Sequence, residues 1–359
     1  MSTYYFVNQV IPNPLHPIFL CGTKYTRSDP RDKRNVLEKY ISDNRLGKPI
    51  ILERFFSLSG KGKSLLPYKD ILIKGLYDIE QIMSYMADEI IIVHDSYSTS
   101  AELGFFSSNI NIMKKTIVLL PQQYSVDEDK KKGFIQFAFN DRENSASFFW
   151  YTPVFEKVRY SNDRKGFHSY FLDNHIDEVL SYKIKSKINS DIDTELSFIF
   201  TLKTLKFNKS HILFERHEDT LSVSIPVKLT LHLVLAALTD QRLVDILESK
   251  TKIIECRNEI ISKLEHYFIN TYKEISKDLN ILNKVEMNVS EIDFSLFNHS
   301  IGNIIGFALY ALKALDYIEL PYQDKRFGLT SEGKNSIIVY SQLLTPSKSF
   351  LKKGDVSFD

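Results

Sequence analysis

Short apolar runs alternate with amphipathic helical patterns along the first third of the chain. The apolar runs are a few residues long and stop at glycine, proline or polar residues, which is typical of buried strands in a parallel sheet. The helical patterns place apolar residues at intervals of three and four. The predicted strands are 16–22, 48–56, 89–95 and 115–121, and the predicted helices are 29–44, 71–88 and 101–111. Strands that alternate with helices predict βαβ units in a doubly wound α/β sheet.

The rest of the chain divides into a mixed middle and a helical end. Residues 122–225 contain strand-like segments such as "GFIQFAF" and "TLSVSIPV" but no chemistry that the pattern identifies. Long helical patterns dominate from residue 226 onward. The last of them, with a short strand, a polar turn, the strand "RFGLT" and a helix near Ser331, predicts a winged helix-turn-helix. We therefore expect an α/β domain at 1–225, with its core at 16–121, and a helical domain at 226–359.

Composition and charge narrow the class of protein. The chain has 359 residues, of which 43% are hydrophobic and 25% charged, as in globular proteins. A net charge of +1 predicts no long-range attraction to nucleic acid, so such contact requires a local basic group such as Lys325, Arg326 and Lys334. Cys21 and Cys256 fit neither a disulfide framework nor a zinc site, and the histidines show no metal-ligand spacing. Without a signal-like N-terminus or a membrane-length apolar run, we expect a soluble cytoplasmic protein with no metal.

Candidate chemistry begins with Glu102, which follows the strand at 89–95 and the polar stretch "SYSTS". In an open α/β sheet, ligands bind beyond the carboxyl ends of the strands, at the N-termini of the following helices. Free backbone N–H groups there keep a carboxylate ionised and directed into the crevice. The hydroxyls of Ser96, Thr99 and Ser100 either cap the helix or bind a sugar or phosphate. A purely structural role for Glu102 at the helix start stays open.

Glu80 is a second acid that can reach the same end of the sheet. In the helical pattern at 71–88, an apolar stripe runs at helical spacing from Leu76 to Met86, and Glu80 borders that stripe. An acid beside the core-facing side of a helix is expected to point toward the sheet rather than into free solvent.

The segment "EQIMSYMADEIIIVHDSYSTSAELGFF" resembles the core of nucleoside 2-deoxyribosyltransferases. These enzymes have an acid eight residues before an Asp that precedes a strand, and a nucleophilic Glu in a helix start with the sequence "ELG". Glu80 with Asp88 matches the first spacing, and Glu102 with Leu103 and Gly104 matches the nucleophile. The resemblance covers about 16–121 and implies that these two glutamates are catalytic.

The same resemblance implies further pocket residues. The stretch "IFLCGT" is similar to the first strand and glycine turn of the family, so Gly22 and Thr23 are expected to line the pocket. The second pocket acid of the family falls on Ser96 in this chain. The adjacent Asp95 is its expected substitute.

The order of the predicted domains resembles the effector proteins of bacterial retron anti-phage systems. That family has the same "FLCG" opening, the "E…AD" helix and the "S…AELG" segment. The resemblance implies a flavodoxin- or Rossmann-like parallel sheet domain followed by a winged helix-turn-helix. It also implies an N-glycosidase toxin that is held by a reverse transcriptase and its multicopy single-stranded DNA (msDNA) and released during phage infection. We also expect an oligomer.

The implied chemistry assigns a role to each acid. Cleavage of an N-glycosidic bond develops positive charge at C1′ of the sugar, and a carboxylate beneath that carbon stabilises the charge or attacks it. We assign this role to Glu102, and protonation of the leaving base to Glu80 or Asp95. Nicotinamide departs neutral without that proton, so NAD is the leading substrate, and purine nucleotides stay open. Hydrolase and transferase both stay open, and no cofactor is expected.

Two other functions stay open at this point. The chain is a nucleotide-sensing binding module if Glu102 holds a ribose hydroxyl without turnover. It is a DNA-binding regulator if the N-terminal domain is vestigial. The presence of both Glu80 and Glu102 at the family spacing favours catalysis.

Overall fold

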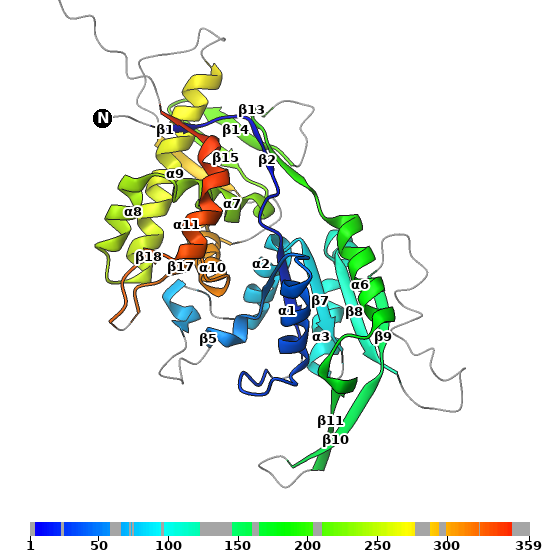
Figure 1. Cartoon of the computed structure of the whole chain (residues 1–359). Helices are drawn as coiled ribbons and strands as arrows, with labels where there is room; N and C mark the ends of the chain where they lie inside the picture. The colour runs from blue at the N-terminus through cyan, green and yellow to red at the C-terminus, as the bar shows by residue number, and fades with distance from the viewer. Residues whose placement is uncertain are drawn as a thin grey trace, which may run out of the picture. The chain divides into compact units, whose positions relative to one another are not determined.

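The computed structural model describes residues 4–22, 25–57, 66–71, 73, 75–94, 97–122, 146–159, 165–203, 210–276, 288–293, 299–322 and 324–346. The chain forms two compact units, and Figure 1 labels many of their helices and strands. The sheet unit consists of Leu15–Lys69 and Ile73–Asp193, and the helical unit consists of Met1–Pro14, Asp70–Leu72 and Thr194–Asp359. The helical unit thus takes in residues from both ends of the chain.

A five-stranded parallel sheet forms the centre of the sheet unit. Its order is β4 (Lys48–Ile50), β3 (Pro17–Cys21), β7 (Glu89–Val93), β8 (Thr116–Pro121) and β9 (Ser147–Tyr151). The predicted parallel α/β sheet is confirmed, because all four strand pairs are parallel. The chain runs outward from β3 to β4 and then returns to the other side of β3, where β7 pairs with it. The strand order therefore reverses between β3 and β7.

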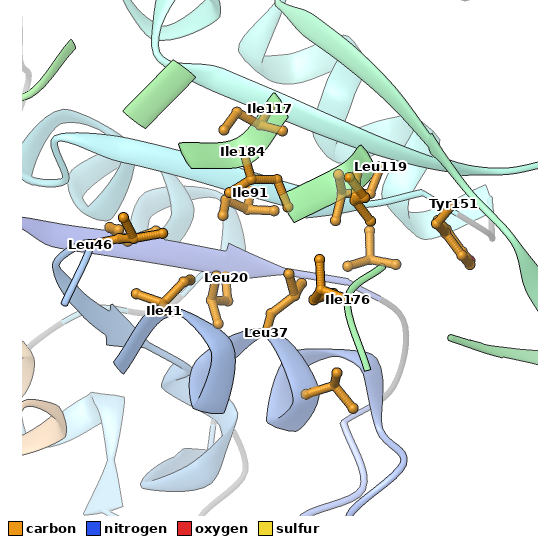
Figure 2. Close-up of a cluster of buried hydrophobic side chains, with 14 of the residues drawn as sticks. Leu20, Leu37, Ile41, Leu46, Ile91, Ile117, Leu119, Tyr151, Ile176 and Ile184 are labelled. Atoms are coloured by element: carbon orange, nitrogen blue, oxygen red, sulfur yellow. The ribbon is translucent and has the colours of Figure 1, made fainter. Parts of the chain in front are cut away.

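Buried helices pack against this sheet. Helices α1 (Lys33–Asp43) and α6 (Glu178–Asp191) share one apolar cluster with the strands (Figure 2). The residues of the cluster labelled there are Leu20, Leu37, Ile41, Leu46, Ile91, Ile117, Leu119, Tyr151, Ile176 and Ile184. Side chains alternate along a strand, so the equally buried Phe19 and Cys21 face the opposite side of β3. Helix α2 (Leu76–Met86) lies against β3, and α3 (Tyr97–Phe106) lies against β7.

One predicted helix boundary is wrong in a way that matters for the site. The helix predicted at 101–111 is two helices, α3 and α4 (Ile110–Lys114), and α3 begins at Tyr97. Glu102 consequently lies in the second turn of α3 rather than at its start. Thr99 and Leu103 are buried at helical spacing. Their packing outweighs the weak helix propensity of the serine- and threonine-rich stretch.

The predicted strand at 48–56 is also shorter than expected. It ends at Ile50, and Leu52–Arg54 form a 3₁₀ turn that takes Glu53 out of the sheet. A minor parallel pair, β5 (Phe56–Ser57) with β6 (Leu66–Pro67), follows this turn.

A long hairpin completes the described part of the sheet unit. Strands β10 (Pro153–Arg159) and β11 (Lys165–Phe171) pair antiparallel. The ammonium of Lys33 in α1 donates to Ser169 Oγ in β11 at 2.6 Å and to Tyr151 OH at 3.3 Å. These three buried side chains fix the hairpin base to the start of α1.

The helical unit combines a helix cluster with a four-stranded sheet. Its helices are α7 (Val227–Ala237), α8 (Gln241–Glu248), α9 (Ile253–Ile275), α10 (Ile301–Ala314) and α11 (Ser331–Ile337). Its sheet has the order β13 (Phe200–Leu202), β14 (Ile212–His217), β15 (Thr220–Ser224) and β16 (Asn288–Asp293). Two antiparallel pairs tie in the chain ends, β1 (Tyr4–Phe6) with β19 (Leu344–Pro346) and β2 (Gln9–Pro12) with β12 (Glu195–Phe198).

The segment predicted as a winged helix-turn-helix contains the expected order of elements. Helix α10 is followed by β17 (Ile318–Glu319), which pairs antiparallel with β18 (Gly328–Leu329), and then by α11. Within the predicted basic group, Lys325 pairs with Glu319 at 3.1 Å. Part of the positive charge near the β17–β18 pair is therefore neutralised internally. None of the helices in the described ranges is long and apolar enough to cross a membrane.

Candidate active site

The candidate site lies at the carboxyl ends of β3 and β7, where the strand order reverses. In open α/β sheets this reversal opens a crevice that binds ligands. Gly22 follows β3 directly, and His94 follows β7. Helices α2 and α3, which lie against these two strands, carry Glu80 and Glu102.

Glu102 is partly buried, and its environment favours the protonated form. Its Oε2 atom is buried and has no hydrogen-bond partner. Burial raises the pKa of Glu102 to about 8, with a further contribution from the negative charges of Glu80 and Glu53, while Arg34 acts in the opposite direction. A carboxylate oxygen without a donor is expensive to bury unless a ligand or a proton satisfies it.

Glu80 shares this environment. Burial, and then the charge of Glu53, raise the pKa of Glu80 to about 7. Because Glu80 also raises the pKa of Glu102, the two carboxyls titrate as a coupled pair. Near neutral pH such a pair holds a proton, which is the arrangement that general acid–base catalysis needs.

Glu53 and Arg34 are site residues that the sequence did not indicate. The 3₁₀ turn after β4 presents Glu53, whose Oε1 atom accepts a hydrogen bond from Arg34 Nη1 at 2.5 Å. The Arg34 side chain is 2% exposed, whereas that of Glu53 is 51% exposed. Lys33 and Arg34 are adjacent cations in the first turn of α1 and oppose the helix dipole, but this signal does not distinguish one from the other.

Gly22 lies beside this arginine. A Cβ atom added to Gly22 would lie 3.4 Å from both Cδ and Nε of Arg34. The missing side chain lets the guanidinium approach the end of β3 closely. Gly22 thus borders the site through Arg34.

Cys21 links these groups into one cluster. It is the last residue of β3 and is buried. Burial raises the pKa of its thiol, and the charges of Glu102, Glu80 and Glu53 raise it further, opposed by Arg34. The thiol is therefore neutral, and the three acids and the guanidinium all lie close enough to act on it. We call Glu53, Glu80 and Glu102 the acid cluster.

The other predicted site residues have different outcomes. Thr99 is fully buried in α3, and Ser100 is exposed. The Ser100 hydroxyl forms a hydrogen bond with His94 Nε2 at 2.9 Å. Thr23, Asp95 and Ser96 lie outside the described residues.

A buried acid elsewhere in the sheet provides a contrast. Glu89, the first residue of β7, is 1% exposed, and burial followed by the charge of Asp191 raises its pKa to about 9. It lies at the opposite end of β7, where Lys187 and Lys115 offset the negative charge. Burial of a carboxyl alone therefore does not distinguish the candidate site. What distinguishes it is that two acids with raised pKa values lie near the point where the strand order reverses.

The acid cluster can bind positive charge and exchange protons. Among the described residues, Glu80 and Glu53 add negative charge around Glu102 and Arg34 opposes it, so the site is negative when its acids ionise. That charge is complementary to a cationic substrate or to a cationic transition state. Among the described residues, no group of three or more histidine, cysteine, aspartate and glutamate side chains is arranged to hold a metal ion.

The sequence of this chain is similar to proteins of retron systems. The family model described as STM3845 retron effector protein matches residues 30–319. A protein of Escherichia coli, provisionally named a retron Ec73 ribosyltransferase/DNA-binding protein, is 33% identical over 106 residues, or 28% of this chain. The match spans 31% of the length of that relative. A structure of UDP-N-acetylmuramoyl-L-alanyl-D-glutamate–2,6-diaminopimelate ligase aligns with 79% of this chain and 69% of its own, at 9% identity and a TM-score of 0.20, which is too low to carry an argument.

Proposed function

The chain belongs to the STM3845 retron effector protein family, and from that premise we propose that it is an N-glycosidase effector of a retron anti-phage system. Its substrate is a nucleotide, with NAD as the first choice and a purine nucleotide as the second. The observation that carries the proposal is the meeting of Glu80 and Glu102 at the strand reversal, each with its pKa raised close to neutrality. The relative named a ribosyltransferase supports the same class of chemistry.

In this proposal Glu102 acts on the sugar and Glu80 handles the proton. The acid pair carries a proton in the free enzyme, and catalysis requires that this proton reside on Glu80 while Glu102 is ionised. A substrate with a positive charge favours that state, because the charge lowers the pKa of the carboxyl nearest to it. The nicotinamide ring of NAD is such a group.

The first step breaks the C1′–N bond. The electron pair of that bond goes to the nicotinamide nitrogen, which becomes neutral, while a carboxylate oxygen of Glu102 bonds to C1′. Glu80 then loses its proton to solvent and accepts one from the water that attacks C1′, and Glu102 departs as a carboxylate. With a purine nucleotide, Glu80 would first donate its proton to the leaving base.

The remaining assignments belong to the same proposal. Gly22 and Thr23 border the substrate, and the hydroxyls of Ser96, Thr99 and Ser100 hold the sugar or position the helix. Asp95 is a second candidate for the proton donor. A reverse transcriptase and its msDNA hold the effector, the helical unit contributes a winged helix, and the effector acts as an oligomer. Membership of a retron effector family supports the association with a retron.

Release of free base tests the proposal. The purified chain is incubated with NAD and with a panel of purine nucleotides, and free base is separated by chromatography. The Glu102→Gln variant is expected to release none. The matched control is Glu89→Gln. It removes a buried carboxyl from the start of β7, at the end of that strand opposite the candidate site, and is expected to keep full activity.

Two outcomes would reject parts of the proposal. Equal activity of the wild type and Glu102→Gln would reject Glu102 as the nucleophile. Saturable nucleotide binding by the purified chain, with no base release there or in phage-infected cells that co-express a retron reverse transcriptase and its msDNA, would identify a nucleotide-sensing module instead.

A further inference from the structure

A buried arginine lies against the first turn of a long helix in the helical unit. Arg257, in α9, is only 7% exposed. Its Nε and Nη2 atoms donate to Asn258 Oδ1 at 3.2 and 2.9 Å. Its third nitrogen, Nη1, is buried and has no hydrogen-bond partner. Burial lowers the pKa of Arg257, and no described carboxylate offsets that effect.

The side chain of Arg257 runs along α10 toward the N-terminus of that helix. A Cβ atom added to Gly306 would lie 3.4 Å from Cδ of Arg257. One added to Gly302, one turn earlier, would lie 3.4 Å from both Cζ and Nη1. Gly302 is the second residue of α10, so the guanidinium is directed at the first helical turn.

This arrangement brings two positive groups together. The N-terminus of a 14-residue helix carries partial positive charge and backbone N–H groups without intrahelical partners. The Ser300 side chain caps the N–H of Asn303, and the first turn contains no acidic residue. A guanidinium at this position is therefore unfavourable unless an anion contacts both the guanidinium and the free N–H groups at the helix end.

We propose that Arg257 and the first turn of α10 form a binding site for a phosphate group. Nη1 of Arg257 and the backbone N–H groups of Ile301 and Gly302 hold it, because a tetrahedral oxyanion can offer oxygens to both sets of donors. The phosphate comes from the backbone of a nucleic acid or from a free nucleotide. The site lies in the helical unit and is independent of the proposed glycosidase.

The test is calorimetric titration of the full chain with inorganic phosphate at constant ionic strength. The wild type is expected to bind, and Arg257→Met is expected to raise the dissociation constant by about tenfold or more, because it removes a charged hydrogen-bond donor. The matched control is Arg242→Met, which removes an exposed arginine from α8 and is expected to bind phosphate like the wild type.

Thermal unfolding without phosphate separates loss of the site from loss of the fold. Arg257→Met is expected to melt at or above the wild-type temperature, because it leaves no buried partner uncompensated. Arg257→Lys keeps the charge and replaces the methionine variant in the titration if that variant does not fold. It is expected to bind phosphate more weakly than the wild type.

Two competitors identify the source of the phosphate. Displacement by a single-stranded oligonucleotide without terminal phosphates indicates a nucleic-acid backbone, and displacement only by a mononucleotide indicates a free nucleotide. Equal phosphate affinity in the wild type and Arg257→Met would overturn the proposal. Absence of phosphate binding by the wild type would overturn it as well.

Discussion

Replacement of Glu102 by glutamine is expected to stabilise the sheet unit while it abolishes activity, and the stabilisation is expected to grow with pH. Burial and the charges of Glu80 and Glu53 raise the pKa of Glu102 from 4.5 to about 8. The unfolded chain keeps the ordinary value, so the folded state binds the proton more tightly. The favourable contribution of this proton to folding is complete below pH 4.5 and is lost as pH rises toward 8.

The size of the effect follows from the same interval. Each pH unit corresponds to about 1.36 kcal/mol, so the whole interval has an upper limit on the order of 5 kcal/mol. Water penetration and the proton shared with Glu80 reduce that limit. We expect the glutamine variant to gain about 1.5 kcal/mol over the wild type between pH 5.5 and pH 7.5.

Urea denaturation measures this difference at each pH. Trp150, the only tryptophan of the chain, lies in β9, so its fluorescence reports unfolding of the sheet unit. The control is Glu178→Gln, which changes an exposed acid on α6 of the same unit. A stability difference between Glu102→Gln and the wild type that is identical at both pH values would refute the buried, proton-binding environment assigned to Glu102.

Three further predictions concern the site. Glu53→Gln removes a negative charge that raises the pKa of both Glu80 and Glu102, so the pH profile of base release should move to lower pH. An unchanged profile would contradict the influence of Glu53 on these two pKa values. Glu80→Gln should slow purine release about a hundredfold more than nicotinamide release, because only the purine needs the proton; equal losses in chromatographic assays would exclude that role. Gly22→Val should crowd Arg34 and lower the free energy of unfolding of the sheet unit, measured in urea, by about 1–3 kcal/mol. A variant as stable as the wild type would show that Arg34 does not pack tightly against Gly22.

The sheet was predictable because its strands are short, apolar and separated by amphipathic helices. Ile90, Ile91 and Ile92 are buried on both faces, and such continuous runs occur in covered parallel strands. The strand order was not predictable in the same way, because the pairing of β3 with β7 depends on tertiary packing. The start of α3 was predicted four residues too late, because the prediction followed local helix propensity. The burial of Thr99 outweighs that propensity in the folded chain.

The candidate site was predictable only where local spacing carries the information. Glu80 stands out in the sequence because it borders a helical apolar stripe, and Glu102 because it follows the strand at 89–95 and a polar stretch. Glu53 and Arg34 do not, because they come from a different strand end and a different helix and meet only in the folded chain. The electrostatics of the site depends on this meeting, so the sequence alone could not predict the raised pKa values.

The most direct test of the central claim is to trap the sugar on the enzyme. A 2′-fluoro analogue of NAD slows the second step, since the electron-withdrawing fluorine destabilises the positive charge at C1′. After incubation and proteolysis, mass spectrometry should find the peptide that contains Glu102 heavier by one sugar nucleotide, in the wild type and in Glu89→Gln. The role assigned to Glu102 would be contradicted if the base were released in full while the adduct formed on another residue or did not form at all.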